Sequence, residues 1–211
     1  MSAVEELIGE HGAAVVKVPS GRGGRGIYVV NPEAKETSAF QGTRELHMPP
    51  ADFVSAHVAE VAEHRSVMVM EPLQPPAFDL DVLAWQGRAV HLLPRKRLFS
   101  ALPNEGHVIV RNESMRDIGR RIVEGFQASW LFDIDFMLTD TGAPAVLEIN
   151  PRASGSVAVP LAAGVPLIDD LLSLIAGDDV TPIEPPYDAL VFPHTALHVS
   201  PAGEWDTSGI S

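Results

Sequence analysis

Apolar and polar positions alternate along this chain with two periods, one typical of strands and one typical of amphipathic helices. Strands are expected at residues 14–18, 27–30, 67–70, 78–85, 89–97 and 190–200, and helices at 4–12, from 49 onward, at 115–128 and at 167–176. Strands and helices do not alternate steadily, as they would in a doubly wound parallel sheet. The pattern therefore predicts the α+β class. The prolines at 74–76 indicate a boundary between two lobes, of residues 1–73 and 74–211.

The most informative segment is 135–152, in which two apolar runs that carry acids are joined by a short polar turn. If the chain turns about the Thr141–Gly142 bond, Asp135 lies directly opposite Glu148. Opposed residues of a hairpin have Cβ atoms about 5 Å apart, and like charges at that distance destabilise the pair. We therefore expect a cation to lie between these two carboxylates.

The same register places Asp133 opposite Asn150, and it places Asn150 on the same side of its strand as Glu148. The oxygens of Asp135, Glu148 and Asn150 form a ligand set that suits Mg²⁺ or Mn²⁺ better than zinc. The alternative is a polar sheet edge whose acids face water. A one-residue bulge would also put the two acids on opposite faces.

Composition narrows the class of protein. The chain has 211 residues, 45% hydrophobic and 20% charged, which is ordinary for a globular protein with a substantial core. Its net charge of −13 argues against nucleic acid or an anionic membrane as a partner. The absence of cysteine excludes disulfides, thiol nucleophiles and thiolate metal sites. No apolar run is long enough to span a membrane, and the acidic start is unlike a signal peptide, so we expect a cytoplasmic protein.

The glycine-rich segment 21–26 matches the dinucleotide-binding spacing G-x-G-x-x-G, but the strand that follows it contradicts that interpretation, because the motif must open a helix. What remains is a glycine flap whose backbone N–H groups can surround phosphate oxygens. The alternative is a flexible hairpin loop. Lys17 favours the flap, because a lysine inside an apolar strand is costly to bury unless it meets an anion.

Two further motifs carry charge on predicted strands. Arg95 and Arg97 share one face, where two guanidinium groups suit a phosphate or an oxyanion, although charges that guard a solvated edge strand would look the same. Asp79 and Asp81 likewise share a face, as a half-exposed strand or as contacts to a ribose or a substrate. Arg152 follows Asn150 closely and adds a guanidinium beside the proposed metal.

Taken in order, these segments resemble the ATP-grasp superfamily, particularly its carboxylate–amine ligase and carbamoyl-phosphate-synthase-like branches. The resemblance runs from about Glu5 to Ile175. It rests on Val-Val-Lys-Val-Pro before the flap, Val-Met-Val-Met-Glu-Pro-Leu between the lobes, Asp79-Leu80-Asp81-Val82, Pro-Arg-Lys-Arg-Leu and Leu-Glu-Ile-Asn-Pro-Arg-Ala-Ser-Gly.

The resemblance implies a two-lobed α+β fold, in which a small lid lobe (1–73) and a larger antiparallel-sheet core lobe (74–211) clasp ATP and Mg²⁺. It also implies roles for individual residues. These are Lys17 on the nucleotide phosphates, Gly21, Gly23, Gly24 and Gly26 in the lid loop, Glu71 and Leu73 at the adenine-reading hinge, Asp79 on the ribose, Asp135, Glu148 and Asn150 on the metal, and Arg152 and Arg95 on the acyl-phosphate.

The function implied by the resemblance is an ATP-dependent ligase that activates a carboxylate as an acyl-phosphate, which an amine or a similar nucleophile then attacks. Small carboxylates and amines would be its substrates. The chain lacks the N-terminal domain and the second nucleotide-contacting lysine that are usual in the family. We therefore expect a fragment, or a homo-oligomer or partner subunit that supplies those parts. The alternative is a non-catalytic ATP-binding module or subunit.

Overall fold

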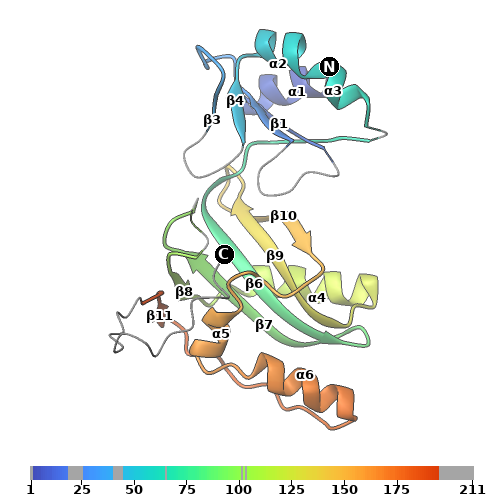
Figure 1. Cartoon of the computed structure of the whole chain (residues 1–211), viewed down its shortest axis with the longest axis vertical. Coiled ribbons are helices and arrows are strands. Elements are labelled where there is room, and N and C mark those ends of the chain that lie inside the picture. The colour runs from blue at the N-terminus through green and yellow to red at the C-terminus, as the bar shows by residue number, and fades with distance from the viewer. Residues whose placement is uncertain are drawn as a thin grey trace, which may run out of the picture.

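The computed structural model describes residues 2–18, 26–39, 45–64, 66–100, 102 and 104–194, and its strands form two separate sheets (Figure 1). The first sheet has five strands in the order β3-β4-β2-β1-β5. Its elements are α1 (Ser2–His11), β1 (Ala14–Lys17), β2 (Ile27–Val30), β3 (Ser38–Ala39), β4 (Leu46–Met48), α2 (Pro50–Ala56), α3 (Val58–Ala62) and β5 (Met68–Met70).

The second sheet has six strands in the order β10-β9-β6-β7-β8-β11, and every pairing in it is antiparallel. Its elements are β6 (Gln74–Trp85), β7 (Arg88–Arg97), β8 (His107–Ile109), α4 (Glu113–Phe126), β9 (Trp130–Leu138), β10 (Pro144–Asn150), α5 (Ala158–Ala162), α6 (Leu167–Ala176) and β11 (Leu190–Val191). The predicted α+β class is confirmed.

The N-terminal sheet is held by one apolar core under its helices. Alternate residues of β1 and β2 face that core, which contains Val16, Tyr28 and Val30, and Phe53 of α2 packs into it. The helix predicted from Pro49 onward is interrupted at His57, so that it forms two short helices, α2 and α3.

The larger sheet has helices on both faces, and its two faces differ in chemistry. One face packs against α4 through an apolar cluster that includes Leu80, Ile134 and Phe136. Gly119 lets α4 approach closely, because a Cβ atom there would lie 2.6 Å from Leu80 Cδ2. The other face packs partly against α5 and α6 and carries the charged residues of β6, β7 and β9 beyond that apolar contact. The functional candidates therefore lie on the face opposite α4.

Several sequence predictions need correction in detail. The segment 74–76 is the start of β6, although the two sheets do divide between β5 and β6; a domain boundary at Gln74 remains our proposal. The last strand ends at Val191, and residues 195–200 of its predicted span lie outside the described residues. The pattern missed β3, β4, β8 and α5, each of which has five residues or fewer.

Candidate functional site

The hairpin of β9 and β10 brings the predicted acids together. Asp135 pairs with Glu148 and Asp133 pairs with Asn150, so both predicted pairings are confirmed. The predicted turn position is wrong, however. Residues nearer the turn pair as if the loop were centred on Thr141, and a register shift between Val146 and Glu148 leaves one extra residue in β10.

The extra residue is Leu147, which lies at a β-bulge. A bulge adds one residue to one strand and changes the register by one position. Because the loop centre is displaced from the predicted bond by half a residue, the bulge restores the predicted register beyond it. The two departures cancel, and the acids lie on one face of the sheet.

Pairing with β6 enlarges this acidic cluster. Asp79 lies beside Asp135, and Asp81 lies beside Asp133. Oxygens of Asp79, Asp133 and Asp135 all lie within 4.8 Å of one another, and Asp79 and Asp133 are only 1% and 4% exposed. Glu148 on the edge strand extends the same face. The cluster therefore concentrates carboxylates in a buried place, where ionised groups need compensation.

Part of that compensation comes from Arg97. Its Nε donates to Asp79 Oδ1 and Oδ2 at 3.1 and 3.0 Å, and its Nη2 donates to Asp135 Oδ1 at 2.9 Å. His107 Nε2 lies 3.1 Å from Asp79 Oδ2. Burial raises the pKa of Asp79, but the hydrogen bonds with His107 and Arg97 outweigh it, so its pKa lies well below the ordinary value. Asp79 is thus held as a carboxylate within the sheet.

Arg95 points to the same face as Arg97, and its Nη1 lies 3.9 Å from Asp79 Oδ2, but its hydrogen bonds go to other partners. Its side chain is fully buried, and its Nε donates to Asp81 Oδ2 at 2.5 Å. Its Nη1 and Nη2 donate to Ser156 Oγ at 3.1 Å and to Ser154 Oγ at 3.5 Å. Arg95 therefore ties β6 and β7 to the loop that follows β10, and it presents no exposed atoms to a ligand in this conformation.

Compensation is weakest at Asp133, and at Asp135 it is only partial. Burial, together with the carboxylates of Asp135, Asp81 and Asp79, raises the pKa of Asp133 to about 8. Burial also raises the pKa of Asp135 to about 7, with Arg97 opposing and Asp79 adding to the effect. Asp133 Oδ1 is buried without a hydrogen-bond partner. An all-oxygen site with a lone acceptor and repelling carboxylates fits a hard divalent cation such as Mg²⁺.

We expect Asp133→Asn to stabilise the metal-free protein at pH 8. A carboxyl whose pKa is raised on folding binds its proton more tightly in the folded state, so stability falls as pH rises from about 4 to about 8. The raised pKa sets an upper limit of about 5 kcal/mol for the gain at pH 8. We expect at least about 2 kcal/mol, or roughly 4–8 °C in Tm, and the gain should shrink toward pH 4. Thermal unfolding in EDTA measures this effect. The exposed Asp179→Asn is the matched control, and a gain that does not depend on pH would contradict the assignment.

Lys17, at the end of β1, reaches the site from the N-terminal sheet. Its Nζ donates to Leu147 O at 3.0 Å, so the lysine contacts the carbonyl at the β10 bulge. This contact joins the N-terminal sheet to the hairpin, whose tip points toward that sheet in Figure 1. Lys17 of β1 therefore contacts β10 at the residue that precedes Glu148.

The flap and the connection between the sheets contain the other predicted nucleotide contacts. Gly26 has φ +70°, and Val18 N–H donates to Gly26 O at 2.9 Å, which closes the base of the flap. A Cβ atom at Gly26 would overlap Val18, so this position requires glycine. Glu71 and Leu73 lie half-buried between β5 and β6, and His11 Nδ1 lies 3.8 Å from Glu71 Oε2. The predicted contacts at Gly21, Gly23 and Gly24 lie outside the described residues.

Asn150 and Arg152 lie at the open end of the cluster. Asn150 Nδ2 donates to Asp133 Oδ2 at 3.4 Å, and Asn150 Oδ1 accepts from Arg152 Nη2 at 3.4 Å. Arg152 is exposed, and its Nη1 donates to Ala153 O at 3.0 Å. Arg152 is therefore accessible to a ligand, whereas Arg95 is not.

Sequence reasoning gave no role to Asp133 or His107, which the structure places in this cluster. It assigned Arg97 to a phosphate or an oxyanion and Asp81 to a ribose or a substrate, whereas the structure pairs Arg97 with Asp79 and Asp135, and Asp81 with Arg95. Alternation along the strands had already put Asp81 beside Asp79 and Arg97 beside Arg95, and it had put Asp133 opposite Asn150. What it lacked was the order of the strands in the sheet. His107 gave no signal, because its strand is only three residues long.

Comparisons with known proteins identify the family and the fold. The family model described as "ATP-grasp in the biosynthetic pathway with Ter operon" matches residues 63–195. No curated protein matches the chain in sequence. Within the described residues, none of the helices is both long and apolar enough to cross a membrane.

Solved structures resemble the fold. They include N5-carboxyaminoimidazole synthetase from Staphylococcus aureus complexed with ADP, at 14% identity and a TM-score of 0.60, with 86% of this chain matching 46% of that one. The biotin carboxylase domain of Hydrogenobacter thermophilus 2-oxoglutarate carboxylase is 16% identical and has a TM-score of 0.58, with 83% of this chain matching 39% of that one. D-alanine–D-alanine ligase from Coxiella burnetii is 19% identical and has a TM-score of 0.53, with 81% of this chain matching 47% of that one. The chain thus spans less than half the length of each, and the similarity concerns the fold.

Proposed function

Since the chain belongs to the ATP-grasp superfamily, in the family of ATP-grasp proteins associated with the Ter operon, we propose that it is an ATP- and Mg²⁺-dependent ligase. Its substrate carboxylate is phosphorylated by ATP, and an amine or a similar nucleophile displaces phosphate from the acyl-phosphate to give an amide. The observation that carries the proposal is the largely buried group of Asp79, Asp133 and Asp135, which Glu148 and Asn150 extend onto the edge strand β10.

The acidic residues support this chemistry by their position. Asp135 and Glu148 face each other across the hairpin and would hold the metal, with Asp133 and Asn150 completing the oxygen set. Bound there, Mg²⁺ would neutralise phosphate oxygens and orient the transferred phosphoryl group. Arg97 already contacts both Asp79 and Asp135, so it positions the carboxylates and limits their repulsion.

The basic residues would act on the anionic partners. Lys17 reaches the hairpin from the lid side, and from there its ammonium can bind the phosphates of the nucleotide. The exposed guanidinium of Arg152 lies beside Asn150 and can bind an acyl-phosphate oxygen. This reaction requires no covalent protein nucleophile, because the carboxylate of the substrate attacks the γ-phosphorus directly.

The proposal is tested by ADP release. The protein is supplied with ATP and a panel of amino acids and small carboxylates, each with and without Mg²⁺. We expect ADP and phosphate to appear only with Mg²⁺ and to rise with one class of carboxylate. Nucleotide binding by calorimetry is measured in parallel. If no Mg²⁺-dependent uptake of ATP is detected, alone or with a partner chain, the proposal is rejected.

A second candidate is a nucleotide-binding module that does not complete catalysis by itself. Arg95 favours this candidate, because a proposed catalytic guanidinium is fully buried and bonded to Asp81 and two serines. The same pair of assays separates the candidates. If the chain binds ATP in the presence of Mg²⁺ but releases no ADP by itself, it is the module, whether or not a second subunit restores ADP release.

We expect Lys17→Met to weaken the binding of Mg²⁺–ATP by about 10-fold or more, because a charge-assisted hydrogen bond contributes about 1.5–3 kcal/mol. Fluorescence or calorimetric titration measures the Kd. Lys35→Met is the matched control, since Lys35 is exposed in the same lobe. Equal affinity in the wild-type protein and in Lys17→Met would remove Lys17 from the nucleotide site, while the metal assignment would stand.

A further inference from the structure

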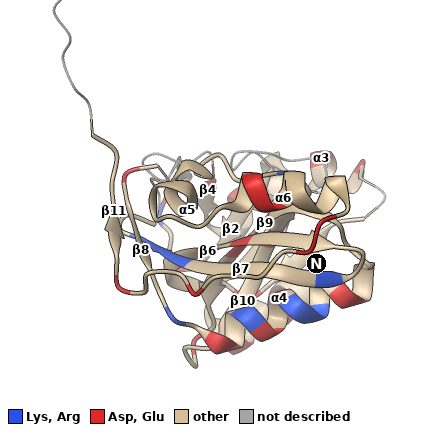
Figure 2. Ribbon diagram, turned by 90° about the horizontal axis from the view of Figure 1, so that it is seen from below, with Lys and Arg blue, Asp and Glu red and all other residues tan. Residues whose placement is uncertain are grey.

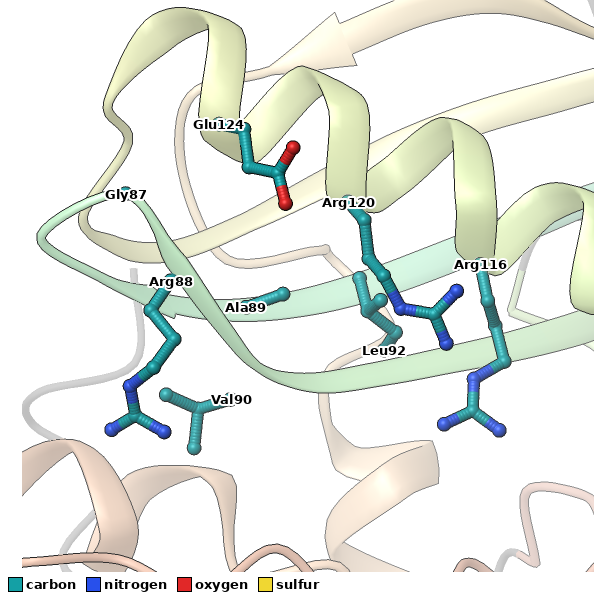
Figure 3. Close-up of a pocket in the computed structure, with 8 residues that line it drawn as sticks. All are labelled: Gly87, Arg88, Ala89, Val90, Leu92, Arg116, Arg120 and Glu124. Atoms are coloured by element: carbon teal, nitrogen blue, oxygen red, sulfur yellow. The ribbon is translucent and has the colours of Figure 1, made fainter.

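A pocket of about 290 Å³ lies on the opposite side of the larger sheet, between β7 and α4. It is separate from the acidic cluster, which occupies the other face. Eight residues line it: Gly87, Arg88, Ala89, Val90, Leu92, Arg116, Arg120 and Glu124. Figure 3 shows Arg116 and Arg120 reaching down from α4 at one end of the pocket and Arg88 standing at the other end, next to the turn at Gly87.

The lining is basic in a chain that is strongly acidic. It has three arginines against the single carboxylate of Glu124, although the whole protein has a net charge of −13. Basic and acidic residues recur along α4 in Figure 2. Arg88 is exposed, and among the described residues no carboxylate lies within ion-pair distance of it. Arg88 therefore offers an unpaired positive charge, while Arg116 and Arg120 have carboxylate partners on α4 outside the lining.

Arg116 is the most informative of the three. Its Nη1 donates to Tyr187 Oη at 2.9 Å and to Glu113 Oε1 at 3.3 Å, but its Nε is buried and has no hydrogen-bond partner. A buried donor left without an acceptor is costly. An anion in the pocket would supply the acceptor. A guanidinium group that merely guards a sheet edge would instead have its donors in water.

The contacts of Arg120 leave it available to a ligand. It pairs with Asp117, three residues earlier on α4, and its Nη2 lies 3.9 Å from Glu113 Oε2. Exposed ion pairs of this kind contribute about 0.2–1 kcal/mol, so an anionic ligand can displace them at little cost.

The strand beneath the pocket is also open. β8 pairs with β7 only from Arg95 to Arg97, so in the part of the chain that the structure describes no strand covers residues 88–94 on the side away from β6. Between the basic ends the lining is apolar, formed by Ala89, Val90 and Leu92.

We infer that this pocket binds a small molecule with an anionic group at each end, phosphate or carboxylate, and a less polar middle. One end is bound by Arg116 and Arg120, the other end by Arg88, and the middle lies on the apolar lining. Arginine suits both anions, because its planar fork donates two parallel hydrogen bonds. The site requires neither ATP nor the metal, so it is independent of the proposed ligase function.

The test is calorimetry in EDTA with three probes: fructose 1,6-bisphosphate, adipate and inorganic phosphate. We expect at least one two-headed probe to bind one molecule per chain and at least about 10-fold more tightly than phosphate. The stronger response identifies the anion as phosphate or carboxylate. Arg88→Ala should lower the affinity for the two-headed probe to that for inorganic phosphate. The affinity for inorganic phosphate itself should not change. Arg120→Ala should weaken all probes.

Two controls locate the binding. Arg121→Ala changes an exposed arginine of α4 that does not line the pocket. This variant should bind the probes with the affinity of the wild-type protein. Lys17→Met should also leave binding unchanged, because Lys17 belongs to the other site. The inference is overturned if neither two-headed probe binds, if Arg88→Ala and Arg120→Ala bind as the wild-type protein does, or if Lys17→Met abolishes binding.

Discussion

Asp135→Asn is expected to reduce Mg²⁺-dependent ADP release by at least about 100-fold. Asp135 lies between Asp79 on β6 and Glu148 on β10, so it is the central carboxylate of the proposed metal site. A bound metal stabilises the transferred phosphoryl group by several kcal/mol, and each 1.36 kcal/mol of barrier changes the rate tenfold. Asparagine has the same size but removes the charge. Steady-state ADP release at saturating ATP measures the loss.

The fold should survive this change, which separates a chemical effect from a structural one. The pKa of Asp135 is raised to about 7, first by burial, so a neutral side chain is well tolerated at this place. Thermal unfolding in EDTA should therefore be no worse than for the wild-type protein. Glu148→Gln should show the same loss of turnover, and the exposed Asp179→Asn should show none. Wild-type turnover in both Asp135→Asn and Glu148→Gln would reject the metal assignment.

Arg95→Met is expected to destabilise the protein by about 3–5 kcal/mol, because removal of one member of a buried ion pair leaves the other charge unpaired. Arg95 is fully buried, and Asp81, its partner at 2.5 Å, is 2% exposed. Burial raises the pKa of Asp81 even with Arg95 beside it. Without Arg95, an ionised Asp81 would be still more costly. Denaturant unfolding monitored by circular dichroism measures the free energy of unfolding.

A double variant tests the cause of this destabilisation. Arg95→Met combined with Asp81→Leu removes both charges and should recover at least half of the lost free energy of unfolding. Lys96→Met is the matched control, since Lys96 is exposed on the adjacent position of β7. If the double variant is no more stable than Arg95→Met, the loss comes from packing or from the two serines and not from the unpaired Asp81.

Local patterns were sufficient for much of the fold. The assumed turn about the Thr141–Gly142 bond predicted that Asp135 faces Glu148, which holds only because the bulge offsets the misplaced turn, and helical spacing gave the bounds of α6 correctly. Both patterns depend on residues close together in sequence. The turn at Gln86 and Gly87, with φ of +50° and +75°, also follows from local chemistry, because this two-residue loop favours left-handed residues.

Contacts between distant segments were not predictable in the same way. The pairing of β6 with β9 is what brings Asp79 beside Asp135, and nothing in either segment specifies that neighbour. The burial of Arg95 depends on Ser154 and Ser156, about sixty residues further along the chain. The sequence therefore proposed candidate residues, while the sheet order decided which of them share a charge network.

The bulge at Leu147 separates two properties that the hairpin combines. Cross-strand neighbours point the same way whatever the loop length, so a chain lacking Leu147 would keep the carboxylates of Asp135 and Glu148 together and lose only the carbonyl to which Lys17 is anchored. The contact between Lys17 and the hairpin and the pairing of Asp135 with Glu148 can thus vary independently. A single-codon deletion would dissect one from the other.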